Sequence, residues 1–233
     1  MRKIAFLIVL FVLAGSRLAA PPPKARPYHL ELELTPGAAF PYLGKFGKTD
    51  LHVYSGGVRG EALWLHGFSR NGASAVTVVN PLARMYVEVP TSDIVNILTR
   101  LAGDPSAQER KVKPMLLAPV KGKVEGIDAT RYRLQYGPTA FIDVWTTTVV
   151  PQNPQLRLLV NEVVGGVAPG TASVASKLPG TPIYVELNFR RFSKVAIVRF
   201  KKLTFSAQGE ADALTLGTGY VRASILEKLL EGH

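Results

Sequence analysis

The chain contains no cysteine among its 233 residues. Disulfide bonds, thiol nucleophiles and cysteine-ligated metal sites are therefore excluded. A lipid anchor on a processed N-terminal cysteine is excluded for the same reason. Without such crosslinks the protein must be stabilised by a hydrophobic core, and its length and 47% hydrophobic content are enough to form one.

Histidines and catalytic motifs are also scarce. The four histidines are His29, His52, His66 and His233, and none has the spacing of a metal-binding pair. Residues 63–68, LWLHGF, look like the oxyanion turn of an α/β-hydrolase, but no G-x-S-x-G nucleophile turn is present. We predict no metal, no cofactor and no enzymatic activity. An enzyme of unrecognised type is the least favoured alternative.

Acidic residues are few. The chain has 17 Asp and Glu against 28 Lys and Arg, which gives a net charge of +11. This excess favours anionic partners such as lipid headgroups or acidic glycans, although it also serves solubility alone. Basic residues alternate in predicted strands, so each pair shares one side of its strand. We predict a basic outer face, and an ordinary solvated face is the alternative. Its members are Lys121, Lys123, Arg131, Arg133, Arg199 and Lys201.

Long apolar runs are absent except at the N-terminus. Residues 4–14 are apolar, follow Arg2 and Lys3, and precede small residues, which is the pattern of a secretory signal peptide. We predict a signal peptide over residues 1–20, cut after Ser16 or Ala20, and export to the periplasm or cell surface. An uncleaved anchor is the alternative. Residues 21–27, PPPKARP, form a stiff linker, and residues 28–233 form a single domain.

The remaining pattern predicts a mainly β fold with few helices (α+β). Alternation of apolar and polar residues indicates many successive strands, including residues 28–34, a hairpin around residues 55–57, and residues 181–189. Helical spacing occurs in residues 91–103, 153–166 and 224–232. We therefore predict a strongly curved antiparallel sheet, an incomplete barrel wrapped around two or three helices.

Aromatic residues concentrate in residues 129–147. If the loop around residues 137–138 holds an even number of residues, the aromatics of both strands share one face with Asp143, whereas an odd loop splits the set. That face lines either a hydrophobic core or a ligand cavity. We predict ligand contacts from Tyr132, Tyr136, Phe141, Asp143 and Trp145. Nucleic acid is disfavoured as a partner because the aromatics are expected opposite the basic side chains.

Several segments resemble a family of exported bacterial proteins of unknown function. They are GKVEGIDATRYRLQYG with FIDVWTT, LPGTPIYVELNF, LTLGTGYVRAS and RMYVEVP. That family is similar in fold to the LolA/LolB-type lipoprotein carriers. The resemblance implies an incomplete antiparallel barrel around helices, with an apolar concave cavity into which Tyr132 and Trp145 point.

These observations predict a non-enzymatic periplasmic or cell-surface protein. In the leading hypothesis it binds a hydrophobic or amphiphilic ligand, such as a lipid or acyl chain, in the cavity of a half-barrel. In the alternative it is a structural or interaction subunit of an envelope protein assembly, and its own helices fill the core. Asp143, as a lone buried carboxylate, is the best remaining candidate for a functional acidic group.

Overall fold

The computed structural model describes residues 26–35, 49–62, 65–90, 93, 114–158, 160, 170–189 and 192–224. Four predicted segments lie wholly or almost wholly outside these residues. They are the signal peptide, residues 21–25 of the linker, the helix over residues 91–103 except Asp93, and the C-terminal helix over residues 224–232 except Ser224. Within them, no helix is long and apolar enough to cross a bilayer.

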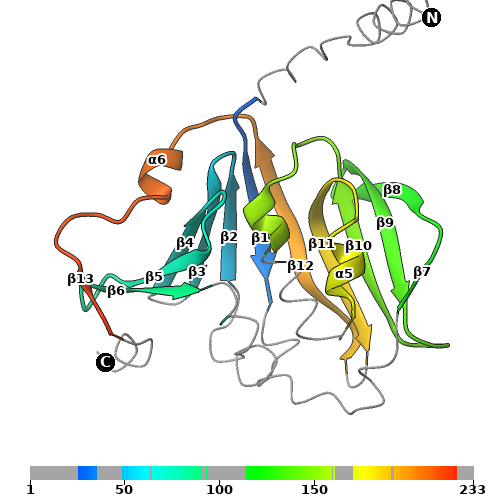
Figure 1. The fold of residues 1–233 in the computed structure, drawn as a ribbon. Helices are drawn as coiled ribbons and strands as arrows, with labels where there is room; N and C mark the ends of the chain where they lie inside the picture. The colour runs from blue at the N-terminus through cyan, green and yellow to red at the C-terminus, as the bar shows by residue number, and fades with distance from the viewer. Residues whose placement is uncertain are drawn as a thin grey trace, which may run out of the picture.

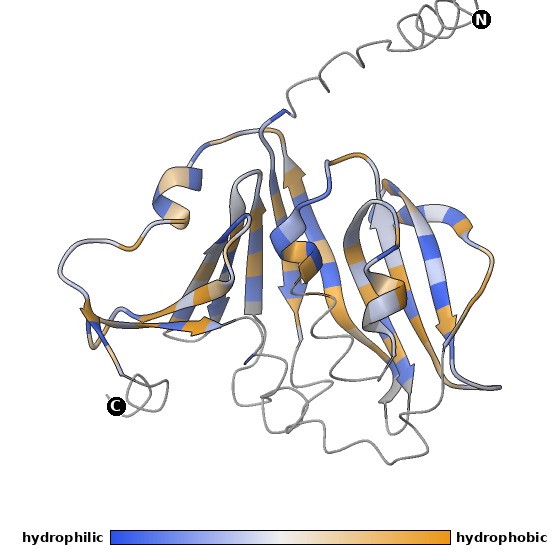
Figure 2. Ribbon diagram, viewed as in Figure 1, coloured by the Kyte–Doolittle hydropathy of each residue, from blue (hydrophilic) through white to orange (hydrophobic). Residues whose placement is uncertain are grey.

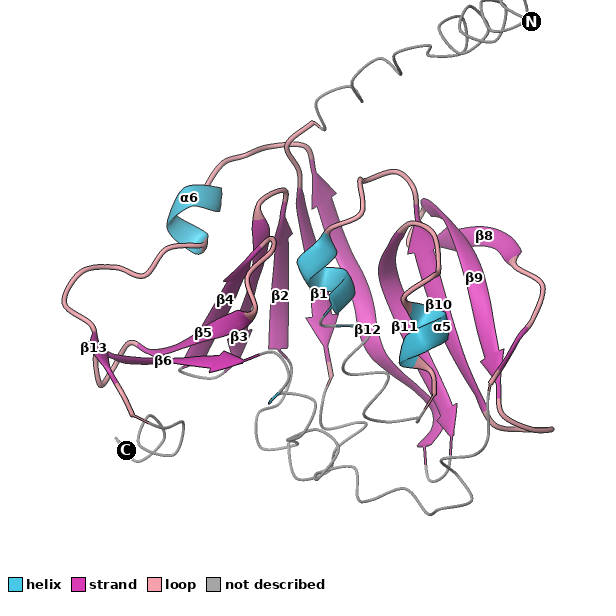
Figure 3. Ribbon diagram, viewed as in Figure 1, coloured by secondary structure: helices cyan, strands magenta, loops and turns pink. Residues whose placement is uncertain are grey.

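A single curved sheet of thirteen strands forms the body of the molecule (Figures 1 and 3). The strands are β1 (His29–Leu34), β2 (Thr49–Tyr54), β3 (Gly57–Ala62), β4 (Leu65–Arg70), β5 (Ala75–Asn80), β6 (Met85–Pro90), β7 (Met115–Leu116), β8 (Val120–Val124), β9 (Ile127–Gln135), β10 (Phe141–Thr147), β11 (Thr181–Phe189), β12 (Phe192–Thr204) and β13 (Val221–Arg222). Their order is β13-β6-β5-β4-β3-β2-β1-β12-β11-β10-β9-β7, and β8 also pairs with β9. The sheet does not close on itself. The predicted mainly β fold with a curved antiparallel sheet is confirmed, and among the described strands the one parallel pair is β13 with β6.

Alternation along each strand separates the two faces of the sheet, as the alternating hydrophobic and hydrophilic bands in Figure 2 show. In β1, Leu30 and Leu32 are fully buried, and they lie opposite Val53 and Leu51 of β2. His29 and the other polar residues of β1 lie on the other face. The same rule applies to β10 and β11, where Ile142, Val144, Ile183, Val185 and Leu187 continue the apolar face.

This apolar face is covered by helical residues 154–158 and 160 and by α5 (Ala172–Ala175). Leu156 has no exposed surface and belongs to the same hydrophobic cluster as the strand residues. Asn153 caps the helix by accepting a hydrogen bond from the Leu156 N–H at 2.9 Å, and its side chain donates to the Tyr54 carbonyl at 2.7 Å. Side chains of the protein itself therefore fill the space between the sheet and this helix.

The C-terminal segment covers part of the opposite face. After β12 the chain forms the short helix α6 (Glu210–Ala213), and Leu214 then packs with Tyr54, Phe68 and Val79 in a second, smaller cluster. Tyr54 lies on this face because it pairs with His29 rather than with Leu30. The chain then crosses to the edge of the sheet, where β13 pairs with β6. Among the described residues, none covers the rest of the polar face, over β9 to β12.

Candidate functional site

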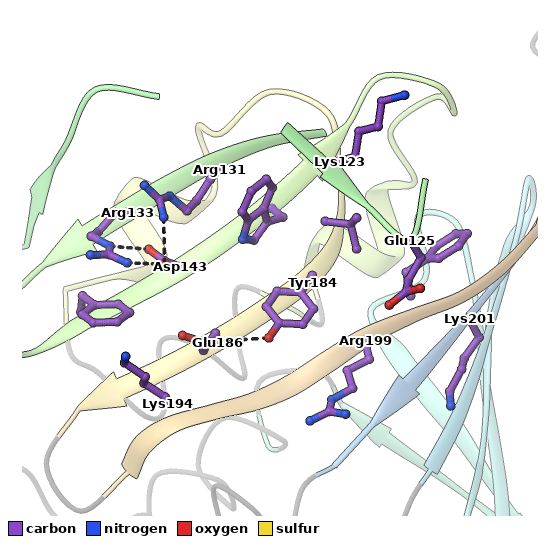
Figure 4. A pocket seen from close by; sticks show the side chains of 14 residues that line it. Lys123, Glu125, Arg131, Arg133, Asp143, Tyr184, Glu186, Lys194, Arg199 and Lys201 are labelled. Atoms are coloured by element: carbon purple, nitrogen blue, oxygen red, sulfur yellow. Dashed lines mark hydrogen bonds and ion pairs between the residues drawn. The ribbon is translucent and has the colours of Figure 1, made fainter. Parts of the chain in front are cut away.

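An open groove of about 980 Å³ lies on the polar face of β8 to β12, on the side of the sheet away from helical residues 154–158 (Figure 4). Its lining contains six cations, three acids and a small set of aromatic and aliphatic residues. They are Lys123, Val124, Glu125, Arg131, Arg133, Phe141, Asp143, Trp145, Tyr184, Glu186, Lys194, Arg199, Phe200 and Lys201. The groove is thus positively charged and partly aromatic.

The register of β9 and β10 decides which aromatic residues face this groove. Trp145 lies opposite Arg131, whereas Tyr132 lies opposite Val144. Residues 136–140 connect the two strands. Because this loop has an odd number of residues, the side chains of β10 face the opposite way from those expected with an even-numbered loop. The prediction that Tyr132 and Trp145 share one face is therefore wrong. Phe141, Asp143 and Trp145 face the groove together.

The two tyrosines of β9 belong to the packed side of the sheet instead. Tyr132 and Tyr136 pack against the main hydrophobic cluster. The hydroxyl of Tyr136 is hydrogen-bonded to the hydroxyl of Thr171, which precedes α5. Burial raises the pKa of Tyr136 well above its ordinary value. Neither tyrosine lines the groove. The predicted ligand contacts of Tyr132 and Tyr136 therefore have no cavity to act in on this face.

A pair of arginines on aromatic rings forms one wall of the groove. Arg133 donates two hydrogen bonds to Asp143, at 2.7 and 2.6 Å, and its guanidinium lies 3.8 Å from the centre of the Phe141 ring. Arg131 lies 5.9 Å from the centre of the Trp145 ring and 4.0 Å from the Asp143 carboxylate. The hydrogen bonds to Asp143 raise the pKa of Arg133. One buried carboxylate and two rings thus hold two guanidinium groups in place.

The other wall comes from β11 and β12. The Tyr184 hydroxyl donates to Glu186 at 3.0 Å, and burial raises the pKa of Tyr184. Lys201 pairs at 2.8 Å with the buried carboxylate of Glu33. Among the described residues, no ion pair or side-chain hydrogen bond of Arg199 is found, and Figure 4 shows its side chain beside Tyr184. Within this part of the chain, no acidic side chain neutralises Arg199.

Only some residues of the predicted basic face lie together. Arg131, Arg133, Arg199 and Lys201 all line the groove, but Lys121 does not. Lys121 lies opposite Thr130 in β9, which alternates with Arg131 and so points to the other side. Lys123 has the same parity and pairs with Asp128 at 3.7 Å, although it also belongs to the lining of the groove.

The cations and aromatics of the groove share one face, although the sequence predicted them on opposite faces. Cations and aromatic rings on one face are compatible with nucleic acid as a partner, contrary to the prediction. Tyr184 and Glu186 were not predicted as groove residues. Their alternation with the buried residues of β11, which are Ile183, Val185 and Leu187, indicates that they lie on the opposite face.

Within the described part of the chain, no group of three or more histidine or acidic side chains is arranged to hold a metal ion.

Comparison with known proteins gives structural matches, two of which have low sequence identity to this chain. No family model matches the chain, and no curated relative is found. An uncharacterised conserved protein from Thermus thermophilus aligns with a TM-score of 0.43 and 11% identity, over 86% of this chain and 92% of the other. MucB, solved in complex with MucA(peri), aligns with a TM-score of 0.41 and 12% identity, over 82% of this chain and 54% of MucB. This chain thus spans about half of MucB, and at this level of similarity no inference about function follows.

Proposed function

We propose that this protein is an exported, non-enzymatic binding module whose groove takes an acidic segment of a partner protein in the cell envelope. The observation that carries the proposal is the excess of cations in the groove, with Arg131 and Arg133 supported by aromatic rings and Arg199 without a partner among the described residues. Guanidinium groups held in this way bind carboxylates with little loss of side-chain entropy. The partly exposed ring of Trp145 adds flat apolar contact beside them.

The geometry favours a peptide over an acyl chain. In the described residues, the face expected to line a half-barrel cavity is packed with Leu156, Ile183 and Leu187, all of which are fully buried. The groove on the other face is lined mainly by charged side chains, nine of the fourteen lining residues. An acyl chain gains its binding energy from apolar surroundings, which such a lining does not offer.

An anionic amphiphile is the second candidate. Phe141, Trp145 and Val124 give the groove an apolar strip beside its cations, which would suit a short chain attached to a charged headgroup. The two candidates share the chemistry of the anion, so an experiment must present the anion on both carriers.

The test uses a short fluorescent peptide in which Glu alternates with Val, and anionic phosphatidylglycerol vesicles as the second probe. We expect micromolar peptide binding that weakens with salt, because the contacts are largely electrostatic. Arg199→Gln should weaken it roughly tenfold, which corresponds to one charge-assisted hydrogen bond. Lys177→Gln, an exposed lysine outside the groove, is the matched control and should bind like the parent.

Two results would overturn the proposal. The first is the absence of saturable peptide binding, and the second is equal binding by the Arg199 and Lys177 variants. Binding to vesicles that Arg199→Gln weakens, without binding to the peptide, would replace the protein partner by an anionic amphiphile.

A further inference from the structure

One edge of the sheet is formed by β7 and β8 (Figure 1). The end of β8 lies next to the groove, because Lys123 and Val124 belong to its lining. Both short strands pair with β9 and, among the described residues, with no strand on their outer side. Large apolar side chains are exposed here, with Met115 61%, Leu116 46% and Val120 45% exposed. Exposed apolar residues on an unpaired strand are unusual, because such an edge invites pairing with another chain.

The turn that ends β8 determines which backbone groups point outward. Glu125 and Gly126 form a two-residue turn, both with positive φ (46° and 83°), and Val124 lies opposite Ile127. The pair that flanks such a turn is hydrogen-bonded, and pairs alternate along the ladder. Gly122 and Val120 therefore bond to β9, whereas Lys121 and Lys123 direct their N–H and C=O groups away from it.

The edge is continuous with the groove through a glycine. A Cβ atom at Gly122 would lie 2.9 Å from the Trp145 ring, so the indole fits directly against the backbone of β8. The pairing of Val120 with Arg131 places it on the same side as the groove. A strand added beside β8 would thus project alternate side chains toward Trp145 and the arginine pair.

We propose that β8 is a docking edge on which the acidic partner segment adds as an extra β-strand. The outward N–H and C=O groups of Lys121 and Lys123 would form hydrogen bonds with the backbone of this strand. Alternate side chains of the strand would then contact the groove. The proposal rests on the proposed function and identifies the bound form of the partner as an extended chain. A second copy of this protein is disfavoured, since pairing β8 with itself would bring these lysines close to their own copies, whereas a partner strand whose acidic side chains face the groove places its other, uncharged side chains beside them.

Lys121→Pro tests the edge because proline removes the outward N–H and is compatible with an edge strand. Lys121→Gln removes the same charge and keeps the N–H, so it is the matched control. We expect Lys121→Pro to bind the alternating Glu-Val peptide at least fivefold more weakly than Lys121→Gln. In the parent protein, peptide binding should slow amide hydrogen exchange at Lys121 and Lys123 and leave exchange in β13 unchanged.

The outcomes separate the edge from the groove. Equal affinities of the two Lys121 variants, with no added exchange protection in β8, would overturn the strand-addition proposal even if Arg199→Gln still weakens binding. Loss of the Arg199 effect would instead overturn the proposed function. Should Lys121→Pro unfold, the exchange measurement on the parent decides alone. Protection of β8 that rises with protein concentration, without peptide, would mean that a second copy occupies the edge and would also overturn the proposal.

Discussion

Arg133 and Asp143 form a two-point ion pair across β9 and β10, and they differ in how deeply they are buried. The Asp143 side chain is 6% exposed and that of Arg133 is 28% exposed. If Arg133 is removed, a buried carboxylate is left with only the more distant Arg131. If the charge of Asp143 is removed, the arginine can still reach water. The cost of breaking the pair is therefore asymmetric.

We expect Arg133→Met to lower the free energy of unfolding by about 2–3 kcal/mol, and Asp143→Asn by about 1 kcal/mol. Methionine is long enough to keep the contact with Phe141, so the loss of stability in Arg133→Met measures the loss of the positive charge. Urea unfolding of both variants and of the double variant measures it. A larger cost for Asp143→Asn would show that the carboxylate is not the buried partner.

Gly122 should be intolerant of any side chain because the Trp145 ring occupies the space. Gly122→Ala is expected to displace the indole, to cost about 1–3 kcal/mol of stability through overpacking, and to shift tryptophan emission. Gly137→Ala is the control, since a Cβ there would meet nothing within 4 Å. The emission should be followed with Trp64 replaced by Phe. Identical emission and stability of the two alanine variants would contradict the close contact.

Glu210 fastens the C-terminal segment to the sheet. Its carboxylate accepts hydrogen bonds from the Ser55 hydroxyl at 2.9 Å and the Gly56 N–H at 2.5 Å. We expect Glu210→Ala to reduce stability by about 1–3 kcal/mol and to speed amide exchange in residues 210–216. Asp212→Ala, on an exposed position of the same short helix, should do neither. Unchanged exchange in the Glu210 variant would mean that Leu214 packing alone holds the segment.

Stability should fall as the pH drops below about 6.5, the ordinary pKa of histidine. Burial lowers the pKa of His29, with a further contribution from His52, and burial followed by the charge of Arg59 lowers the pKa of His66. The unfolded chain therefore binds protons at a higher pH than the folded protein does, so stability is present above this pH and is lost below it.

The measurement is the melting temperature between pH 8 and pH 5 for the parent and for the double variant with His29→Gln and His66→Gln. The loss on acidification should be smaller in the double variant. Glu61, whose pKa is lowered mainly by its hydrogen bond from Arg59, acts only in a more acidic range. A melting temperature that is constant or rises toward pH 5 would contradict the assignment.

Local patterns predicted the strands well. The stretch TPIYVELNF coincides with β11, and YHLELEL contains β1, because alternation is a property of each strand taken alone. Helix α6 was not predicted, since four residues after a left-handed Gly209 leave no helical periodicity to detect. Part of the predicted helix over residues 153–166 is present as residues 154–158, capped by Asn153 as its sequence indicates.

The candidate site was predicted only in fragments. Phe141, Asp143 and Trp145 were correctly grouped with one another, and Arg131 with Arg133, because each group lies within one strand. Their meeting on a single face depends on the five residues that join β9 to β10. A sequence marks such a turn by its glycine and proline but does not fix its length to the residue, and one residue more or fewer reverses the second strand.

The sequence by itself determined the absence of cysteine chemistry, the excess of positive charge and the mainly β character of this protein. These follow from composition and from the two-residue period of a strand, which need no knowledge of distant contacts. Only the tertiary structure decided that Trp145 joins Arg131 rather than Tyr132, and that Arg199 from a distant strand lines the same groove. The reason is that the face a side chain occupies depends on loop parity and strand order, which are set by the packing of the whole sheet.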